Sequence, residues 1–163
     1  MNITIRDAQR EELEYLYKVN QAHTPNVGSI SFQRMQHLYK EAACFKVAEV
    51  GKAFAGFIIA FTPDADYDSP NFLYFKRKYE RFLYLDRIVV LEEYRRNRVG
   101  TAFYDAMAAY VKEHNLEVLT CEYNLRPPNE ISRRFHESYG FREVDIQETE
   151  EGRYTVSLQV KYI

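Results

Sequence analysis

The order of helix-like and strand-like segments predicts an α+β (mixed α/β) fold, in which a mostly antiparallel mixed sheet is flanked by helices. Two observations lead to this prediction. Cys44–Val50 and Ala53–Phe61 are apolar runs separated by Gly51-Lys52, a pattern typical of a β-hairpin. Residues 99–115 then repeat apolar side chains with the helical period, at Val99, Ala102, Phe103, Ala106, Met107 and Tyr110. The chain of 163 residues fits a single domain, 1–163.

Before the hairpin, the pattern predicts one strand and two helices. Asn2–Arg6 alternates in polarity as a short strand does. Asp7 is expected to cap a helix over Gln9–Ala22, and Ser31 to cap a second, shorter helix. Inside the second hairpin strand, Gly56 predicts a bulge or a close approach of two backbones.

Residues 62–81 interrupt the pattern and predict an inserted segment, helical over its later half. The segment starts with a proline and three aspartates, Asp64, Asp66 and Asp68, and continues with alternating aromatic and basic residues. Aromatic rings and carboxylates together could hold a cationic amine. A segment of this length could instead cover a sheet edge or form a homodimer contact.

The second half of the chain predicts further strands around two helices. The helix over 99–115 follows a charged turn at 91–98, and a later helix is expected to stop at Gly140. The remaining expected segments are the strand Phe82–Val90, the strand Glu117–Glu122, the loop Asn124–Pro128, the helix Asn129–Tyr139, and the antiparallel pair Phe141–Gln147 and Arg153–Tyr162.

Composition argues against several classes of protein. The formal net charge of −2 gives no electrostatic reason to expect a nucleic-acid partner. No apolar run approaches the roughly 20 residues that span a bilayer, and no apolar leader core opens the chain. Cys44 and Cys121 lack the spacing of a zinc site or a disulfide framework. We therefore expect no metal, no membrane and a cytoplasmic location.

A basic turn followed by a helix predicts an anion site. Arg95, Arg96 and Arg98 immediately precede the helix that starts near Val99. A helix start presents unpaired N–H groups and the positive end of the helix dipole, which suits a pyrophosphate. Gly100 allows a ligand to approach the backbone closely. The alternative is a solvated arginine turn before an ordinary amphipathic helix.

Two motifs in the expected order resemble the GNAT superfamily of N-acetyltransferases. Arg95–Ala102 resembles its acetyl-CoA loop, R/Q-x-x-G-x-G/A, and Asn129–Phe141 resembles its later helix, N-x-x-A-x-x-F/L-Y-x-x-x-G-F. The resemblance extends over essentially the whole chain, and some stretches are similar to a little-characterised bacterial branch. It implies a transferase that moves an acetyl group from acetyl-CoA to a primary amine, either a small molecule or a peptide, by direct attack.

The resemblance also implies which residues hold coenzyme A. Backbone groups of the strand end and side chains of the later helix would contact the pantetheine arm, and the loop would wrap the pyrophosphate. The strand end comprises Ile88, Val89 and Val90, the helix contributes Asn129 and Ser132, and the loop comprises Arg95, Arg96, Asn97, Arg98, Val99, Gly100 and Thr101. Two residues depart from the family pattern: Arg98 replaces the first loop glycine, and His136 replaces a tyrosine.

In the superfamily, the tyrosine at position 136 would protonate the leaving thiolate, and His136 could do the same as an imidazolium with a pKa near ~6.5. The alternative is a helix histidine that faces solvent or caps a carbonyl. The acceptor ammonium must lose a proton before it attacks, and Asp86 is the expected base, with Glu122 as the second choice. Asp86 could instead form an ion pair with Arg87 or Arg81.

Backbone N–H groups near Val90 would stabilise the oxyanion. The departures at Arg98 and His136 leave a second hypothesis open, a non-catalytic acyl-CoA-binding sensor or interaction module with the same fold.

Overall fold

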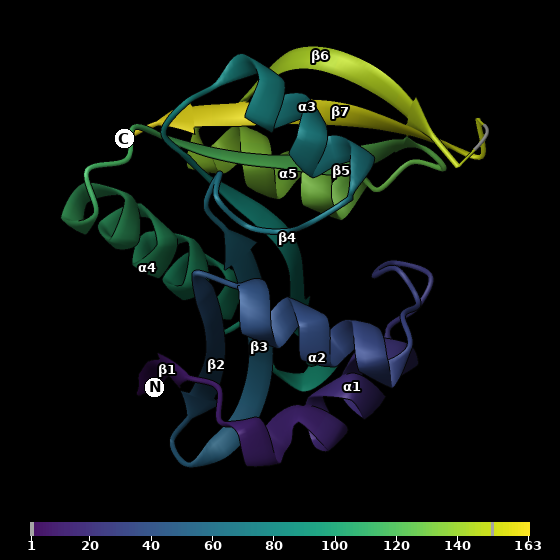
Figure 1. The fold of residues 1–163 in the computed structure, drawn as a ribbon. Helices are drawn as coiled ribbons and strands as arrows, with labels where there is room; N and C mark the ends of the chain where they lie inside the picture. The colour runs from purple at the N-terminus through teal and green to yellow at the C-terminus, as the bar shows by residue number, and fades with distance from the viewer. Residues whose placement is uncertain (1, 151) are drawn as a thin grey trace. The chain divides into compact units, whose positions relative to one another are not determined.

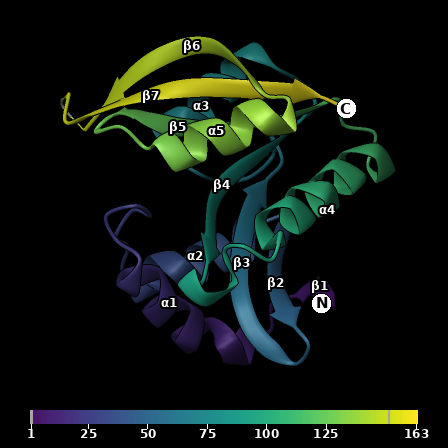
Figure 2. The same ribbon diagram turned by 180° about the vertical axis from the view of Figure 1, so that it is seen from behind.

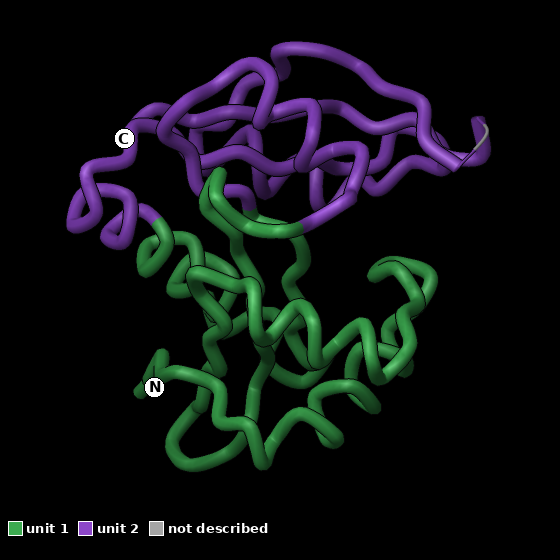
Figure 3. Tube along the Cα trace, viewed as in Figure 1, with its two compact units in different colours: residues 1–66, 85–107 green, residues 67–84, 108–163 purple. Residues whose placement is uncertain are grey.

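A computed structural model describes residues 2–150 and 152–163. Contacts between Cα atoms divide the chain into two compact units, shown in green and purple in Figure 3. Unit 1 comprises residues 1–66 and 85–107, and unit 2 comprises residues 67–84 and 108–163.

The strands form a seven-stranded sheet in the order β1-β2-β3-β4-β5-β7-β6. Most of its pairings are antiparallel, and β4 pairs with β5 in parallel through Phe82–Tyr84 and Val118–Thr120. The predicted fold class is therefore confirmed. The strands are β1 Ile3–Asp7, β2 Cys44–Val50, β3 Ala53–Phe61, β4 Phe82–Val90, β5 Val118–Arg126, β6 Arg142–Thr149 and β7 Tyr154–Tyr162.

Unit 1 contains the β1-β2-β3 ladder together with the helices α1 Leu13–Ala22 and α2 Phe32–Glu41, which contact each other (Figure 1). Ser31 caps α2, as predicted, by accepting a hydrogen bond from the backbone N–H of Arg34. The prediction that Asp7 caps the first helix is wrong. Asp7 ends β1 and pairs with Nζ of Lys46 at 2.5 Å. Gln9 instead starts a short 3₁₀ turn, Arg10–Glu12, through a capping box with Glu12.

Gly56 lies where two backbones meet, as its position in the strand predicted. The β2–β3 register shifts beside it, because Ala48 faces Gly56 while Glu49 faces Phe54. A Cβ at Gly56 would overlap the carbonyl oxygen of Val89 and lie 3.1 Å from the Cα of Val90. The missing side chain thus allows β3 to lie directly against the end of β4 that carries candidate site residues.

In unit 2, helices α3 Pro70–Lys78 and α5 Glu130–Tyr139 lie on opposite faces of the β5-β7-β6 sheet (Figures 1 and 2). The predicted helix in the inserted segment is α3. Its residues Phe72 and Phe75 are fully buried against the rings of Phe82 and Tyr84. These two phenylalanines therefore form core and are not available as an aromatic cage for a cationic amine.

Two hydrogen bonds attach α3 to the edge strand β6. The hydroxyl of Tyr74 donates to Asp145 at 3.0 Å, and Gln147 donates to the side chain of Asn71 at 2.9 Å. Burial, with the hydrogen bond to Asp145 as the next cause, raises the pKa of Tyr74 to about 12. The inserted segment is thus anchored over a face of the sheet and at its edge strand.

The prediction of a loop at Asn124–Pro128 is wrong for the first half of this segment, which is part of a strand. β5 continues to Arg126, because β7 pairs with it as far as Thr155. The later helix stops as predicted at Gly140, whose φ of 107° favours glycine. The remaining elements are the 3₁₀ turn Glu92–Tyr94 and the helix α4, Val99–Glu113, close to the predicted 99–115.

Candidate functional site

The basic turn between β4 and α4 borders a cavity in unit 1. This cavity has a volume of about 550 Å³ and is lined by Ile3, Arg96, Asn97, Arg98, Thr101, Ala102 and Asp105. The first intrahelical hydrogen bond here runs from the N–H of Ala102 to the carbonyl of Arg98. The preceding N–H groups of α4 therefore have no acceptor within the helix, which together with the guanidinium groups favours an anion.

Arg98 has a backbone conformation that explains why a glycine is usual at this motif position. Its φ is 64°, in the left-handed region that glycine adopts without steric cost. Arg98 therefore keeps the glycine-like path of the turn and adds a guanidinium to it. On the other side of the turn, Nε of Arg95 donates to the carbonyl of Val90 at 3.3 Å, which links the turn to the end of β4.

The end of β4 places Ile88 and Val90 in partly exposed positions and buries Val89. The N–H of Leu91 donates to the carbonyl of Ala55, so β3 holds this end of the strand in place. Gly56, also on β3, packs directly against the backbone of Val89 and Val90 and so restricts the same end of β4. These contacts hold the segment that the motif resemblance assigns to the pantetheine arm.

Asp86 forms a buried ion pair with Arg87. Arg87 is one of the two arginines that the sequence offered as ion-pair partners if Asp86 is not a catalytic base. Nε of Arg87 donates to Oδ2 of Asp86 at 2.7 Å, and their side chains are 11% and 5% exposed respectively. Arg81, the other partner considered, pairs with Glu117 instead. The carboxylate of Asp86 is therefore held by a guanidinium on the neighbouring residue.

Arg87 reaches further, to the segment between α1 and α2, and sequence reasoning missed this role. One of its terminal nitrogens donates to Oδ1 of Asn20 at 3.0 Å and to the carbonyl of Gly28 at 3.2 Å. Asn20 is fully buried and also donates to the Gly28 carbonyl, at 3.1 Å. An asparagine on the apolar stripe of a predicted helix was the available signal, because a buried amide needs polar partners.

In unit 2, the start of α5 is organised by Asn129. Its side chain accepts a hydrogen bond from the N–H of Ser132 at 3.2 Å, so it acts as the N-cap of the helix. The hydroxyl of Ser132 in turn lies 3.2 Å from Nδ1 of His136. The three residues predicted on this helix are thus connected along one of its faces.

The side chain of His136 is buried, so the alternative prediction that it faces solvent is wrong. The other alternative, a contact with a backbone carbonyl, is present in the structure. The His136 side chain lies among the rings of Tyr123, Phe135 and Phe141. Nδ1 lies 2.7 Å from the carbonyl oxygen of Ser132. Burial lowers the pKa of His136, and the hydrogen bond to the Ser132 carbonyl opposes this effect.

Glu122, the second candidate base, lies on β5 and accepts a hydrogen bond from the hydroxyl of Tyr84 at 2.7 Å. The neighbouring Cys121 is buried, and desolvation raises the pKa of its thiol well above the usual value. A thiol that resists ionisation is a poor nucleophile. Cys121 therefore behaves as a small core residue.

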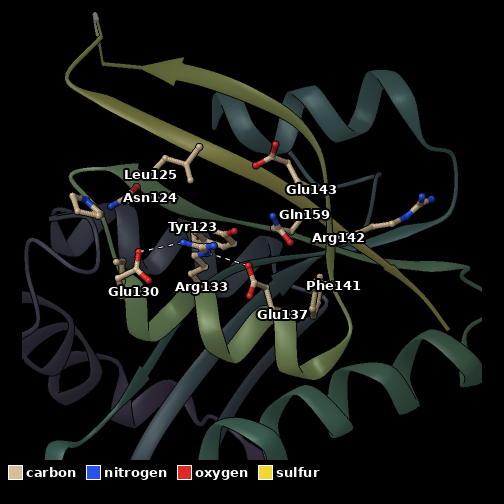
Figure 4. A pocket seen from close by; sticks show the side chains of 12 residues that line it. Tyr123, Asn124, Leu125, Glu130, Arg133, Glu137, Phe141, Arg142, Glu143 and Gln159 are labelled. Atoms are coloured by element: carbon tan, nitrogen blue, oxygen red, sulfur yellow. Dashed lines mark hydrogen bonds and ion pairs between the residues drawn. The ribbon is translucent and has the colours of Figure 1, made fainter.

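A second cavity, of about 570 Å³, lies beside α5 in unit 2 (Figure 4). On α5, Arg133 pairs with Glu130 at 3.5 Å and with Glu137 at 3.0 Å. The predicted site residue on its wall is Asn129. The lining comprises Tyr123, Asn124, Leu125, Pro128, Asn129, Glu130, Arg133, Glu137, Phe141, Arg142, Glu143 and Gln159.

Across residues 2–150 and 152–163, no helix is both long and apolar enough to cross a membrane. Within the same ranges, no three histidine, cysteine, aspartate or glutamate side chains gather as a set of metal ligands.

The sheet order, with a basic turn directly ahead of α4, is accompanied by a family match that defines the class of protein as an acetyltransferase. Residues 5–141 match the Acetyltransferase (GNAT) family, and the chain belongs to this family. It is 29% identical over 143 residues to an N-alpha-acetyltransferase of Sulfurisphaera tokodaii, covering 87% of this chain and 81% of that relative.

Solved structures show the same fold at lower sequence identity. Ard1 from Thermoplasma volcanium superposes with a TM-score of 0.79 at 20% identity, over 100% of this chain and 99% of that one. Arabidopsis thaliana NAA60 in complex with acetyl-CoA gives a TM-score of 0.77 at 17% identity, over 99% and 100% of the two chains.

Proposed function

We propose that this acetyltransferase moves the acetyl group of acetyl-CoA to a primary amine, and that the preferred acceptor is the α-amine at a polypeptide N-terminus. The observation that carries the proposal is the arginine-rich turn at the start of α4, which borders a cavity of about 550 Å³. Family membership supports acetyl transfer, and the name of the Sulfurisphaera tokodaii relative supports an α-amine acceptor.

In this proposal, the pyrophosphate of acetyl-CoA binds to the turn Arg95–Thr101. The N–H groups of the first turn of α4 and the guanidinium groups of Arg95, Arg96 and Arg98 supply hydrogen bonds and positive charge. Ile88–Val90 provide backbone groups to the pantetheine arm. Asn129 and Ser132 contribute side chains to it, and Asn129 does so through its amide nitrogen because its oxygen caps α5.

The reaction proceeds by direct attack of the amine on the thioester carbonyl, and N–H groups near Val90 stabilise the oxyanion. Asp86 is the proposed base, oriented by Arg87, and Glu122 is the alternative. No step needs a covalent enzyme intermediate, because Cys121 and Cys44 are both buried with raised thiol pKa values.

The binding step is tested by calorimetric titration with acetyl-CoA. Gly100→Val should weaken binding strongly, because a branched side chain would occupy the space of the ligand. Ala109→Val on the body of α4 serves as the matched control and should have little effect. Affinity should also fall as salt rises, because charged contacts contribute. Equal and small effects of both substitutions would remove this turn from the site.

The acceptor is tested with a panel of amines at constant acetyl-CoA. Peptides with free N-termini should be acetylated, while the same peptides with blocked N-termini should not, even when they contain lysine. Small amines, amino acids, polyamines and amine antibiotics complete the panel. Transfer to a small amine but not to peptides would overturn the α-amine assignment. Binding of acetyl-CoA with no transfer to any acceptor would favour the non-catalytic acyl-CoA-binding module.

A further inference from the structure

Two buried polar side chains line the cavity of about 570 Å³ beside α5 (Figure 4). They are Gln159 of β7, which is 2% exposed, and Tyr123 of β5, which is 8% exposed. Tyr123 lies opposite Ser157 in the β5–β7 ladder, and Ser157 is two residues from Gln159. Because alternate strand residues share a face, both side chains leave the same face of the sheet, and together they form the floor of the cavity.

The orientation of the Gln159 amide follows from its neighbours. The hydroxyl of Ser157 donates to Oε2 of Glu143 at 2.6 Å, which uses its single proton. In the 2.6 Å contact between Nε2 of Gln159 and the Ser157 hydroxyl, the amide must therefore be the donor. This contact fixes Oε1 as the outer end of the Gln159 amide, and a carbonyl oxygen can only accept a hydrogen bond.

Neither Oε1 of Gln159 nor the hydroxyl of Tyr123 forms a hydrogen bond with any residue among 2–150 and 152–163. In the same part of the chain, no side-chain oxygen or nitrogen is both enclosed and without a hydrogen-bond partner. Both oxygens are therefore accessible, and the cavity is the space that both residues line. Polar groups in so buried a setting favour a partner that satisfies them, so the floor suits a ligand that donates hydrogen bonds.

The charges around the floor favour a donor that is positively charged. The carboxylate of Glu143 lines the same cavity and comes from β6, the strand next to β7. The guanidinium of Arg133 is already paired with Glu130 and Glu137, at 3.5 and 3.0 Å. Figure 4 shows the side chain of Arg142 extending away from the other labelled side chains. The three lining carboxylates thus outnumber the two guanidinium groups, and one of the carboxylates adjoins the floor.

We infer that this cavity binds a primary ammonium group, supplied by a lysine side chain of a polypeptide or by a free alkylamine. An ammonium combines a compact positive charge with three N–H donors. These donors match three acceptors from three neighbouring strands: the Tyr123 hydroxyl on β5, Oε1 of Gln159 on β7 and the carboxylate of Glu143 on β6. A guanidinium holds its donors in one plane and suits a single carboxylate better. The site lies wholly within unit 2 and does not depend on the acetyl transfer proposed above.

Binding is measured by titrating the ¹⁵N-labelled protein with n-butylammonium chloride at neutral pH, without acetyl-CoA. In ¹H–¹⁵N correlation spectra, we expect saturable shifts at the side-chain amide of Gln159 and at the backbone amides of Tyr123 and Glu143. Tetramethylammonium chloride carries the charge without any N–H donor and should give no saturable shift there. The absence of a saturable shift with n-butylammonium, or equal shifts with both salts, would overturn the inference.

Substitutions test each acceptor. Gln159→Leu removes Oε1 and should weaken n-butylammonium binding by about tenfold or more, because the lost hydrogen bond is to a charged group. Tyr123→Phe removes only a hydroxyl, so it provides a second test if the buried Gln159→Leu fails to fold. Glu143→Gln should weaken binding and reduce its dependence on salt.

Glu148→Gln is the matched control, because Glu148 is an exposed carboxylate on the same strand and does not line the cavity. It should leave the affinity unchanged. Wild-type affinity in both folded Tyr123→Phe and folded Glu143→Gln would overturn the inference.

Peptides distinguish the two sources of the ammonium. An N-acetylated peptide amide with one central lysine has no α-amine, so its lysine side chain is its only ammonium. Tighter binding of this peptide than of n-butylammonium would identify a polypeptide lysine, and weaker or equal binding would identify a free amine. Both results support an ammonium site. Equal or tighter binding of the same peptide with arginine in place of lysine would overturn the assignment to an ammonium.

Discussion

Nε of Arg87 donates to Oδ2 of Asp86 across 2.7 Å, although the two residues are consecutive on β4. Consecutive strand residues normally point to opposite faces of the sheet. The guanidinium therefore turns back toward its neighbour while it also binds Asn20 and the carbonyl of Gly28. The proposed base and the segment between α1 and α2 are thus held by one side chain.

The ion pair leads to a prediction for Asp86→Asn. The amide oxygen of asparagine can still accept from Arg87, so we expect a folded protein with near-normal acetyl-CoA affinity. Turnover should fall by roughly 10²–10⁴ because the amide cannot take a proton. Steady-state kinetics and thermal unfolding should be measured on the same preparation, with Glu113→Gln at the exposed end of α4 as the control carboxylate-to-amide change.

Normal turnover combined with a lower melting temperature would limit Asp86 to a structural ion pair. The proposed base would then be Glu122, and Glu122→Gln should show the loss of turnover instead.

The positive φ of Arg98 predicts that Arg98→Gly stabilises the protein. A left-handed conformation costs a non-glycine residue roughly 1–2 kcal/mol, and part of the gain is offset by the greater freedom of glycine when unfolded. We expect a net stabilisation of about 0.5–1 kcal/mol in chemical denaturation. Arg96→Gly removes the same charge without a positive φ in the native chain and should destabilise the protein. If both variants lose stability equally, the conformation of Arg98 carries no such cost.

The close approach of β3 and β4 predicts that Gly56→Ala is poorly tolerated. The added methyl would overlap the carbonyl oxygen of Val89, and backbone atoms cannot move aside as a flexible side chain can. The expected loss is roughly 1–3 kcal/mol or more, together with weaker acetyl-CoA binding through Ile88–Val90. Gly28→Ala is the control, because nothing lies within 4 Å of its added Cβ. Equal unfolding midpoints for the two variants would contradict this account.

The lowered pKa of His136 predicts a pH dependence of stability. Between its folded pKa and the unfolded value near ~6.5, the unfolded chain binds more protons than the folded protein. This contribution to the free energy of unfolding is therefore complete above about pH 6.5 and is lost as pH falls toward the folded pKa. Denaturation at pH 7.5 and 5.5 should show a smaller difference in His136→Phe than in the wild type. An unchanged difference would mean that His136 titrates alike in the folded and unfolded chains.

Patterns that depend on neighbouring residues were predicted well. The observed bounds of β2, β3 and β4 equal those predicted from the sequence. Apolar runs between turn-forming residues depend on local geometry, so the sequence alone is enough to locate them. The predicted N-cap of α2 at Ser31 and the predicted C-cap of α5 at Gly140 are confirmed for the same reason. The wrong predictions depend on distant partners: Asp7 forms a salt bridge with Lys46 on the next strand, and β5 runs through Asn124 because β7 pairs with it.

The sequence by itself determined the fold class and the family resemblance, because each depends on residue order and spacing, and it predicted an anion site at the basic turn before α4 for the same reason. Only the tertiary structure decided the state of the candidate catalytic groups. Asp86 was assigned as a base from its position on the strand, and the structure adds its buried partner Arg87. His136 was assigned as an acid from its place in a motif, and the structure adds that its side chain is buried, that Nδ1 contacts the Ser132 carbonyl, and that burial lowers its pKa. The protonation of a side chain depends on the solvent and charges around it, and residues distant in sequence supply these only when the chain has folded.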